Sequence, residues 1–311
     1  MPPPSNHPAA AKPAKRRFPR SFKELTPAGH FNPRTFFREI VWKSLITPRT
    51  GSHKKPAFPK LARGQMAVTW IGHASFLIQF ANLNVLVDPN FANWLFFLKR
   101  VKRAGLRIED LPPIDLVLIT HAHFDHFHKP SLRRLPNPKL GIMPWGTSTL
   151  ARGLGFDRLI ELKWWESFAT PEWRVTFVPS NHWGARTLRD EHRGYGGFVL
   201  EHSGRRIYHA GDSAYFDGFK EIGQRLAPEV ALLPIGACHP ESFRHVHMGP
   251  QDAVHAFKDL RAQWLVPMHY GHFRLGFEHP DEPPEWLKQL VHERGMSHHL
   301  KILEEGAPHL F

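Results

Sequence analysis

The chain has 311 residues, enough for one large globular domain or two small ones, and its single cysteine, Cys238, excludes an intrachain disulfide. No stretch approaches the roughly 20 apolar residues of a membrane-spanning helix, and the N-terminus lacks the apolar core of a signal peptide, so we expect a cytoplasmic protein that can still contact a membrane surface. The net charge of +13 comes mainly from residues 1–60, which carry 13 Lys/Arg and two Asp/Glu. Residues 61–311 carry 28 Lys/Arg and 26 Asp/Glu, so the basicity belongs to the N-terminal segment and not to the body.

The N-terminal region divides into two parts. Residues 1–20 are basic and rich in Pro and Ala, with too little apolar surface to offset the entropy of ordering, which predicts a disordered basic tail. This tail either stays solvated or contacts an anionic surface. Residues 21–64 form an extension in which apolar residues recur at helical spacing over 35–46, so we expect an amphipathic helix there. The helix either packs on the domain or lies on a membrane surface.

From residue 65 onward the sequence changes to short β-type runs. Segments 66–71, 75–80 and 84–88 are separated by short polar or small-residue turns, as in an antiparallel meander. Six more strands are expected at 116–119, 175–178, 197–201, 206–209, 230–234 and 264–267. Helices are expected at 250–260 and 284–294. Mixed strands and helices without a repeat or linker predict one α/β domain over residues 65–311.

Residues 120–128, T-H-A-H-F-D-H-F-H, place four histidines and one aspartate directly after an apolar run. Residues two apart share a face of an extended segment, so His121 and His123 can point to one place, with Asp125 next in the alternation and His126 after a bend. Imidazole and carboxylate groups are ligands of Zn²⁺, Mn²⁺ or Fe, and a strand end gives a catalytic site a rigid base. The segment therefore predicts a site for two adjacent metal ions and not a surface histidine cluster.

A polar residue follows a predicted strand at three further places, namely His182, Asp212 and His269. One such residue alone is usually a hydrogen-bonded residue at the rim of a sheet. Three together supply the ligands that two metals still need, because strand ends at one edge of a sheet converge. Asp212 has two carboxylate oxygens, so it can bridge both metals.

In this order, the motif at 121–126 followed by His182, Asp212 and His269 resembles the signature of the metallo-β-lactamase superfamily. Seven segments narrow the resemblance to the branch that contains N-acyl-phosphatidylethanolamine-hydrolysing phospholipase D. They span roughly residues 65–311 and read W-I-G-H-A-S-F (70–76), L-V-D-P-N-F (86–91), L-P-P-I-D-L-V-L-I-T-H-A-H-F-D-H (111–126), S-N-H-W-G-A-R-T (180–187), H-A-G-D-S-A-Y (209–215), L-P-I-G-A (233–237) and P-M-H-Y-G-H-F (267–273).

This resemblance implies a fold, a cofactor and a reaction. The fold would be a four-layer αβ/βα sandwich of two mixed β-sheets flanked by helices, with a dinuclear site at their shared edge. The first metal would be held by His121, His123 and His182, the second by Asp125, His126 and His269, with Asp212 as the bridge. The metals would be two zinc ions, although these ligands also accept Mn or Fe. A bridging hydroxide would attack the substrate, and one metal would neutralise charge developing on a phosphodiester.

Several nearby residues keep alternative roles. Asp125, Asp212 and His247 are the residues expected to act in catalysis, with His247 contacting the substrate or donating a proton unless it only caps a helix or orients a ligand. His239 and His245 are neighbours that could take this role. Asp88 either orients a metal-binding histidine through its free ring nitrogen or is a turn residue, and His73 has either a turn role or a similar orienting role. We leave His128 and His272, which add histidines to the pattern, outside the ligand set.

Residues 91–103, F-A-N-W-L-F-F-L-K-R-V-K-R, place large apolar residues beside a basic cluster. This composition suits the headgroup boundary of an anionic bilayer, a buried strand or helix with a basic rim, or single-stranded nucleic acid. Assembly into a homo-oligomer would bury the same segment.

The sequence thus predicts a metal-dependent phosphodiesterase acting on an N-acyl-phosphatidylethanolamine-like phospholipid. The alternatives are a hydrolase of a small lactone or phosphorylated metabolite, a nuclease, and a binding module that has lost the chemistry. The complete set of seven ligands speaks against the last of these.

Overall fold

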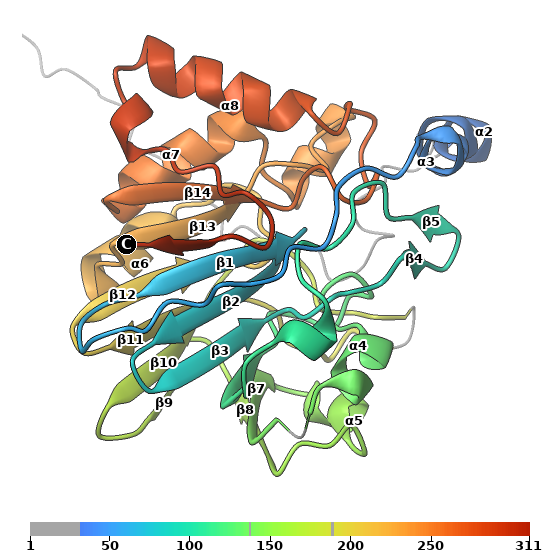
Figure 1. Cartoon of the computed structure of the whole chain (residues 1–311). Helices are drawn as coiled ribbons and strands as arrows, with labels where there is room; N and C mark the ends of the chain where they lie inside the picture. Colours follow the sequence, from blue (N-terminus) through green and yellow to red (C-terminus); the bar gives the residue numbers. More distant parts are fainter. Residues whose placement is uncertain (1–31, 137, 188–189) are drawn as a thin grey trace, which may run out of the picture.

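Two mixed β-sheets lie face to face in the computed structural model, which describes residues 32–136, 138–187 and 190–311 (Figure 1). The first sheet has the order β15-β1-β2-β3-β6-β7-β8 and the second the order β14-β13-β12-β11-β10-β9. In the first sheet the strand pairs from β15 to β3 are antiparallel and those from β3 to β8 are parallel. In the second sheet the pairs from β14 to β12 are parallel and those from β12 to β9 are antiparallel. The tail expected at residues 1–20 lies outside the described residues.

All nine expected strands are confirmed to within two residues at either end. The strands of the first sheet are β1 (Ala67–Gly72), β2 (Ser75–Phe80), β3 (Leu83–Val87), β6 (Leu116–Leu118), β7 (Leu140–Pro144), β8 (Arg158–Leu162) and β15 (Pro308–Leu310). Those of the second are β9 (Ser167–Ala169), β10 (Trp173–Val178), β11 (Gly197–His202), β12 (Arg205–His209), β13 (Val230–Pro234) and β14 (Trp264–Met268). The sequence analysis missed β7, β8, β9 and β15; β9 and β15 are only three residues long and lie at the edges of their sheets.

Helices cover the outer faces of both sheets. The outer face of the first sheet carries α4 (Lys129–Arg134) and α5 (Ser148–Ala151) (Figure 1). The outer face of the second sheet carries α6 (Gly218–Leu226), α7 (Pro250–Leu260) and α8 (Glu282–Glu293). Short 3-10 turns are η2 (Ile108–Asp110), η3 (Glu241–His245) and η4 (Ser297–His299). The order helices, sheet, sheet, helices is the four-layer αβ/βα sandwich that the resemblance implied.

The central strands bury both of their faces in two separate hydrophobic cores. In β2, Phe76, Ile78 and Phe80 belong to the core between the sheets, while Leu77 belongs to the core beneath α4 and α5. Successive side chains of a strand point to opposite faces, so an uninterrupted apolar run fills both cores. These rigid strands then present the residues that follow them at fixed positions.

The expected amphipathic helix is present as one helical run, formed by α2 (Pro33–Phe36), the π-helical η1 (Phe37–Trp42) and α3 (Lys43–Ile46). Residues 91–103 contain a two-stranded hairpin outside both sheets, formed by β4 (Trp94–Leu95) and β5 (Leu98–Lys99). The alternative of a buried element is wrong for Trp94, Phe96 and Phe97, which are exposed. Among the described residues, no helix combines the length and apolar character needed to cross a bilayer.

Candidate metal centre

The seven candidate ligands lie together in two adjoining clusters. His121, His123, His182 and Asp212 form the first cluster, and Asp125, His126 and His269, joined by His73, form the second. Within each cluster the ligand atoms lie within 4.8 Å of one another. The structure thus separates the residues into the two sets that the resemblance implied, and it adds His73 to the second set.

Strand ends from both sheets position these residues. β6 of the first sheet leads into the segment that begins at His121, while β10, β12 and β14 of the second lead to His182, Asp212 and His269. These four strands end at the same edge of the sandwich, which brings side chains far apart in the sequence close together.

Asp212 lies between the two clusters. Its Oδ2 is 3.9 Å from Nε2 of His121 and 3.8 Å from Nε2 of His182 in the first cluster. In the second, the same oxygen is 3.2 Å from Nε2 of His126 and 3.1 Å from Nε2 of His269. The second carboxylate oxygen, Oδ1, is buried and has no hydrogen-bond partner among the described residues. A carboxylate in this position can serve both clusters at once.

Hydrogen bonds outside the clusters fix which ring nitrogen faces inward. Three histidines hold Nδ1 against an outer acceptor, which turns Nε2 toward the site. These contacts join His121 to Thr120 Oγ1 (2.9 Å), His126 to Asp88 Oδ2 (2.7 Å) and His182 to Val246 O (2.9 Å). His123 differs, because its Nδ1 faces Nε2 of His121 at 2.9 Å and Nε2 of His182 at 3.2 Å.

Asp88 makes the orienting contact that the sequence analysis considered for it. Its carboxylate is fully buried and accepts hydrogen bonds from the backbone N–H and the hydroxyl of Thr120 (2.8 and 2.6 Å) as well as facing Nδ1 of His126. The Asp88 carboxylate therefore fixes His126 of the second cluster and also Thr120, the residue directly before His121.

His73 also has an orienting contact in addition to its place in a turn. Its Nε2 lies 2.9 Å from Oδ2 of Asp125, and its carbonyl accepts the backbone N–H of His269 at 3.1 Å. The ring is buried, and its centroid lies 4.1 Å from that of His269. His73 and His269 both adopt a left-handed backbone, with φ of 57° and 60°, a conformation that costs energy and is common at functional sites. One residue thus holds two members of the second cluster.

The charges around Asp212 and the second cluster favour additional positive charge. Burial raises the pKa of Asp212, but His126 and His269 outweigh it and hold that pKa well below its usual value. Burial lowers the pKa of His126, yet the carboxylates of Asp212, Asp125 and Asp88 hold it well above its usual value. A point that attracts a proton this strongly also suits a divalent cation.

The donor set fits divalent metals. It consists of imidazole nitrogens and carboxylate oxygens without a thiolate, a combination that suits zinc, manganese or iron. Nε2 of His126, Nε2 of His269 and Oδ1 of Asp212 are buried without a hydrogen-bond partner among the described residues. Such atoms are costly unless a ligand satisfies them.

His247 faces the same carboxylate from the solvent side. Its Nε2 lies 3.4 Å from Oδ2 of Asp212, and its side chain is 14% exposed. It forms a third group of possible ligands with Asp212 and His269. The structure places His247 beside the clusters, and its role in substrate contact or proton donation stays a prediction.

The sequence analysis missed two residues that support the site, Arg186 and Asn90. Nη1 of Arg186 donates to the carbonyls of Ala122 and Phe127 at 2.7 and 2.9 Å, so this side chain spans the motif. Nδ2 of Asn90 donates to the carbonyl of Asp125 at 2.8 Å. Both lie in segments that carry the resemblance, but contacts to carbonyls leave no pattern in the sequence.

The remaining histidines considered for the site lie elsewhere. Among the described residues, the three ligand groups do not include His239, His245 or the two extra histidines of the motifs. His128 caps α4, with Nδ1 accepting the backbone N–H of Ser131 at 3.2 Å. Nδ1 of His272 contacts the carbonyl of Tyr270 at 2.9 Å.

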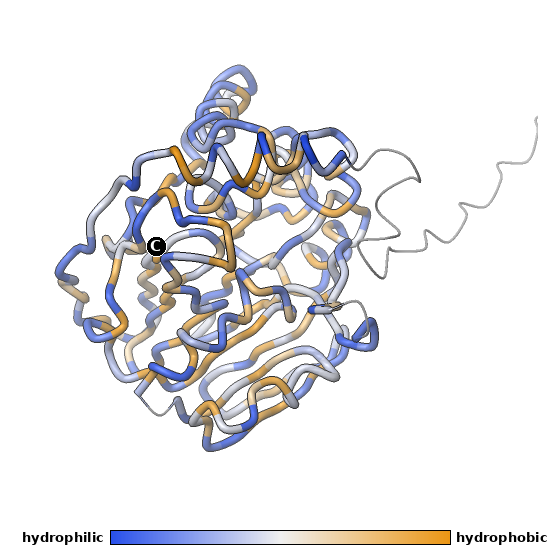
Figure 2. Tube along the Cα trace, turned by 90° about the vertical axis from the view of Figure 1, so that its right-hand side faces the viewer, coloured by the Kyte–Doolittle hydropathy of each residue, from blue (hydrophilic) through white to orange (hydrophobic). Residues whose placement is uncertain are grey.

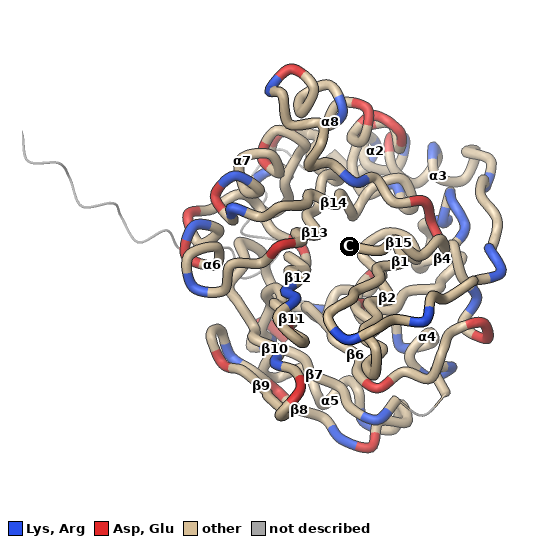
Figure 3. The backbone as a smooth tube through the Cα atoms, turned by 60° about the vertical axis from the view of Figure 1, so that its left-hand side comes forward, with Lys and Arg blue, Asp and Glu red and all other residues tan. Residues whose placement is uncertain are grey.

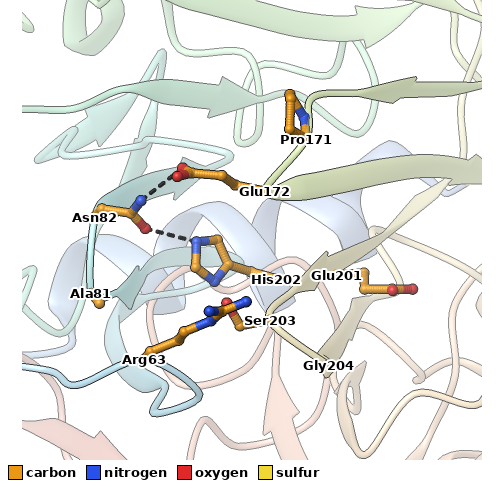
Figure 4. A pocket seen from close by; sticks show the side chains of 9 residues that line it. All are labelled: Arg63, Ala81, Asn82, Pro171, Glu172, Glu201, His202, Ser203 and Gly204. Atoms are coloured by element: carbon orange, nitrogen blue, oxygen red, sulfur yellow. Dashed lines mark hydrogen bonds between the residues drawn. The ribbon is translucent and has the colours of Figure 1, made fainter.

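A separate hollow of about 580 Å³ lies at the turns that join β2 to β3, β9 to β10 and β11 to β12 (Figure 4). There Asn82 receives a hydrogen bond from His202 (2.8 Å) and donates one to Glu172 (2.7 Å). These turns precede the strands that lead to the clusters, so the hollow lies at the opposite edge of the sheets.

The fold and the paired clusters define a metal-dependent hydrolase with the metallo-β-lactamase fold. The family model described as Beta-lactamase superfamily domain matches residues 83–270, and the chain belongs to this superfamily.

Named relatives agree with this assignment. The chain is 32% identical over 248 residues to N-acyl-phosphatidylethanolamine-hydrolyzing phospholipase D 1 of Caenorhabditis elegans, covering 73% of this chain and 70% of that one. It is also 32% identical over 247 residues to a metal-dependent hydrolase of Methanopyrus kandleri, covering 78% and 98%. The solved structure of Igni18, a metallo hydrolase of Ignicoccus hospitalis, matches with a TM-score of 0.62 and 26% identity over 79% of this chain and 98% of that one.

Proposed function

We propose that this protein is a dinuclear phosphodiesterase whose substrate is a phospholipid of the N-acyl-phosphatidylethanolamine type. The position of Asp212 carries the proposal, because Nε2 atoms from both clusters and from His247 lie within 3.9 Å of a single carboxylate oxygen. A protein that only stored or transported one metal would need neither the second cluster nor a partly exposed histidine beside it.

The protein would hold two zinc ions, one in each cluster with Asp212 shared. Two such cations activate water and neutralise charge on a phosphoryl oxygen when they are bound. The chain itself supplies orientation: Asp88 and Thr120 fix the rings of His126 and His121. His247 faces solvent in part and is suited to contact the substrate or to give a proton to the leaving group.

Two observations support a lipid over other phosphodiesters. The Caenorhabditis elegans relative is named as a hydrolase of N-acyl-phosphatidylethanolamine. In addition, Phe96 lies at the tip of an exposed hairpin, and its ring centroid is 4.6 Å from that of Phe124, the residue between His123 and Asp125. An apolar surface at the motif suits a substrate that arrives with acyl chains.

A substrate panel tests the proposal. Purified protein loaded with zinc is assayed on bis(p-nitrophenyl) phosphate, N-acyl-phosphatidylethanolamine in mixed micelles, a set of lactones and single-stranded RNA. We expect hydrolysis of both phosphodiesters, with kcat/KM higher for the lipid. Turnover of lactones alone would contradict the proposal and favour a hydrolase of small esters.

Preferential cleavage of RNA would instead indicate a nuclease. In that case deletion of residues 1–20 should weaken the cleavage and its dependence on salt, because basic tails grip phosphates electrostatically. A chain that binds no metal and hydrolyses nothing on the panel would be a binding module.

A further inference from the structure

Seven exposed hydrophobic side chains gather on two segments near the N-terminal end of the described chain. We call this surface the apolar face and define it as Phe37, Trp42, Leu45, Ile46, Trp94, Phe96 and Phe97, with exposed fractions from 40% to 70%. Among the described residues, Leu310 is the one other large hydrophobic side chain that is exposed. Exposed apolar residues usually lie singly on a protein surface, so a group of this size marks an interaction site.

The two segments form one continuous surface. The hydroxyl of Ser44 in α3 donates to the carbonyl of Lys99 in β5 and accepts its backbone N–H, both at 3.0 Å. Nζ of Lys99 also donates to the carbonyl of Leu45 at 2.9 Å. α3 therefore lies beside the hairpin, as Figure 1 shows at the right of the molecule, and Figure 2 shows hydrophobic and hydrophilic positions alternating along this helical run. The helical run buries Ile40 and Val41, whereas Phe37, Trp42, Leu45 and Ile46 are exposed.

The segments that carry the apolar face are rich in basic residues. Residues 32–50 and 91–107 together carry nine Lys/Arg and a single acidic residue, Glu39. Of these, Arg34 and Arg38 are exposed, while Arg100 is buried. Three of the nine form ion pairs, Arg38 and Lys43 with Glu39 and Lys102 with Glu305, so the two segments keep a net positive charge. Figure 3 shows several Lys and Arg positions near α3 and β4. The surface thus combines large apolar side chains, two of them tryptophans, with a positively charged rim.

The charge also decides which occupant fits. If a second copy of the chain covered this face around a two-fold axis, each basic rim would meet the other, and like charges at an interface oppose association. An anionic bilayer offers apolar chains to the seven side chains and negative headgroups to the rim.

The metal centre lies next to this surface. The ring of Phe96 stands 4.6 Å from that of Phe124 in an edge-to-face contact, and the guanidinium of Arg186 lies 3.8 Å from the centre of the Phe124 ring. Arg186 in turn bonds carbonyls on both sides of Phe124. The hairpin tip therefore contacts the metal-binding segment directly.

We propose that the apolar face docks the protein on anionic phospholipid bilayers, with the helical run 33–46 and the hairpin 94–99 entering the headgroup boundary and the metal centre turned toward the membrane. This docking deepens the proposed function and rests on it in one respect, since it explains how a lipid substrate would reach the site.

Vesicle sedimentation of the full metal-loaded chain tests the docking. Vesicles of phosphatidylcholine alone are compared with vesicles that also contain phosphatidylglycerol. We expect binding to the anionic vesicles that weakens as salt rises, because the rim contributes through screened charge. The double variant Phe96→Asp/Phe97→Asp should lower the partition coefficient at least about tenfold.

Two further variants make the result specific. Phe37→Asp/Ile46→Asp, on the helical run, should weaken binding as the hairpin variant does, and it keeps the test decisive if the hairpin variant fails to fold. Leu310→Asp is the matched control, since it charges an equally exposed side chain on β15, and it should change the partition by less than about twofold.

The docking is refuted if the wild type does not bind anionic vesicles, or if Leu310→Asp weakens binding as much as the apolar-face variants do. It is also refuted if light scattering shows that the wild type is a dimer and that the apolar-face variants dissociate this dimer. Vesicle binding needs no turnover. A chain that binds vesicles but hydrolyses no phosphodiester would refute the proposed function and leave the docking proposal intact. A chain that hydrolyses phosphodiesters but does not bind vesicles would refute the docking and leave the proposed function intact.

Discussion

Asp212 is the residue on which the candidate centre depends most. Its carboxylate faces Nε2 atoms of both clusters, and it belongs to two of the ligand groups, one with His182 and one with His247. Removing it would leave buried imidazoles with no shared anion.

We expect Asp212→Ala to lower hydrolysis more than about 100-fold while the protein stays folded. Loss of an outer partner alone costs about 10- to 100-fold in metal affinity or activity, and a shared ligand should cost more. Activity on bis(p-nitrophenyl) phosphate and far-UV circular dichroism measure the two effects. Asp217→Ala, an exposed aspartate five residues later without a side-chain cap bond, is the control. Full activity of Asp212→Ala would remove its bridging role.

His73 should act on the second cluster alone. His73→Ala removes the contact to Asp125 and the ring beside His269, so we expect the metal content to fall from about two equivalents toward one, with the first cluster retained. Metal analysis after gel filtration measures this. His202→Ala is the matched control, because it also removes a buried, hydrogen-bonded histidine but at the opposite edge of the sheets. Equal metal loss in both variants would mean that the effect is only structural.

At the scale of elements, the turn after β12 places Asp212. Gly211 has φ of 62°, and a Cβ there would lie 2.7 Å from the carbonyl oxygen of Gly196 and 2.9 Å from Cβ of Thr120. A glycine is therefore required both by the backbone conformation and by the close approach of two other segments.

We expect Gly211→Ala to destabilise the protein by about 2–3 kcal/mol and to reduce activity, because the turn must shift and Asp212 shifts with it. Gly204→Ala is the control, since Gly204 also has a positive φ of 82° but a Cβ there would meet no atom within 4 Å, and it should cost only about 1 kcal/mol. Chemical denaturation gives both values. Similar losses in the two variants would show that crowding at Gly211 is unimportant.

At the scale of the whole molecule, metals should add stability to a fold that stands without them. The two cores consist of apolar residues from the sheets and helices, and neither includes a candidate ligand. Metal binding to the folded chain then adds about 2.7 kcal/mol at a free metal concentration 100 times Kd.

This added stability should shrink as the pH falls. Burial lowers the pKa of His269, but Asp212 and Asp125 outweigh it and raise that pKa to about 9, so near neutral pH the ring carries a proton that a metal must displace. Each unit of decreasing pH then weakens binding about tenfold for one displaced proton. Melting temperatures of metal-loaded and chelated protein, measured from neutral to mildly acidic pH, should converge. A constant difference would mean that no proton is exchanged.

The sequence by itself determined nine strands of the two sheets and the polar residues that follow them, because both follow from local rules. Apolar runs over 75–80 and 230–234 correspond to β2 and β13 without an error in either bound. Histidine and aspartate residues that follow such runs can be recognised in the sequence. They are expected to lie close together, because strand ends at one edge of a sheet converge.

Only the tertiary structure decided which distant residues touch. The contact of His73 with Asp125, that of Asp88 with His126 and the joining of Ser44 to Lys99 link segments 38 to 55 residues apart. Such contacts depend on how the sheets and loops pack, and a short polar residue looks the same in the sequence whether or not it has a partner. For the same reason the sequence left open whether residues 91–103 form a buried strand or helix or an exposed apolar segment, and the fold decided this, because Trp94, Phe96 and Phe97 lie exposed on a hairpin outside both sheets.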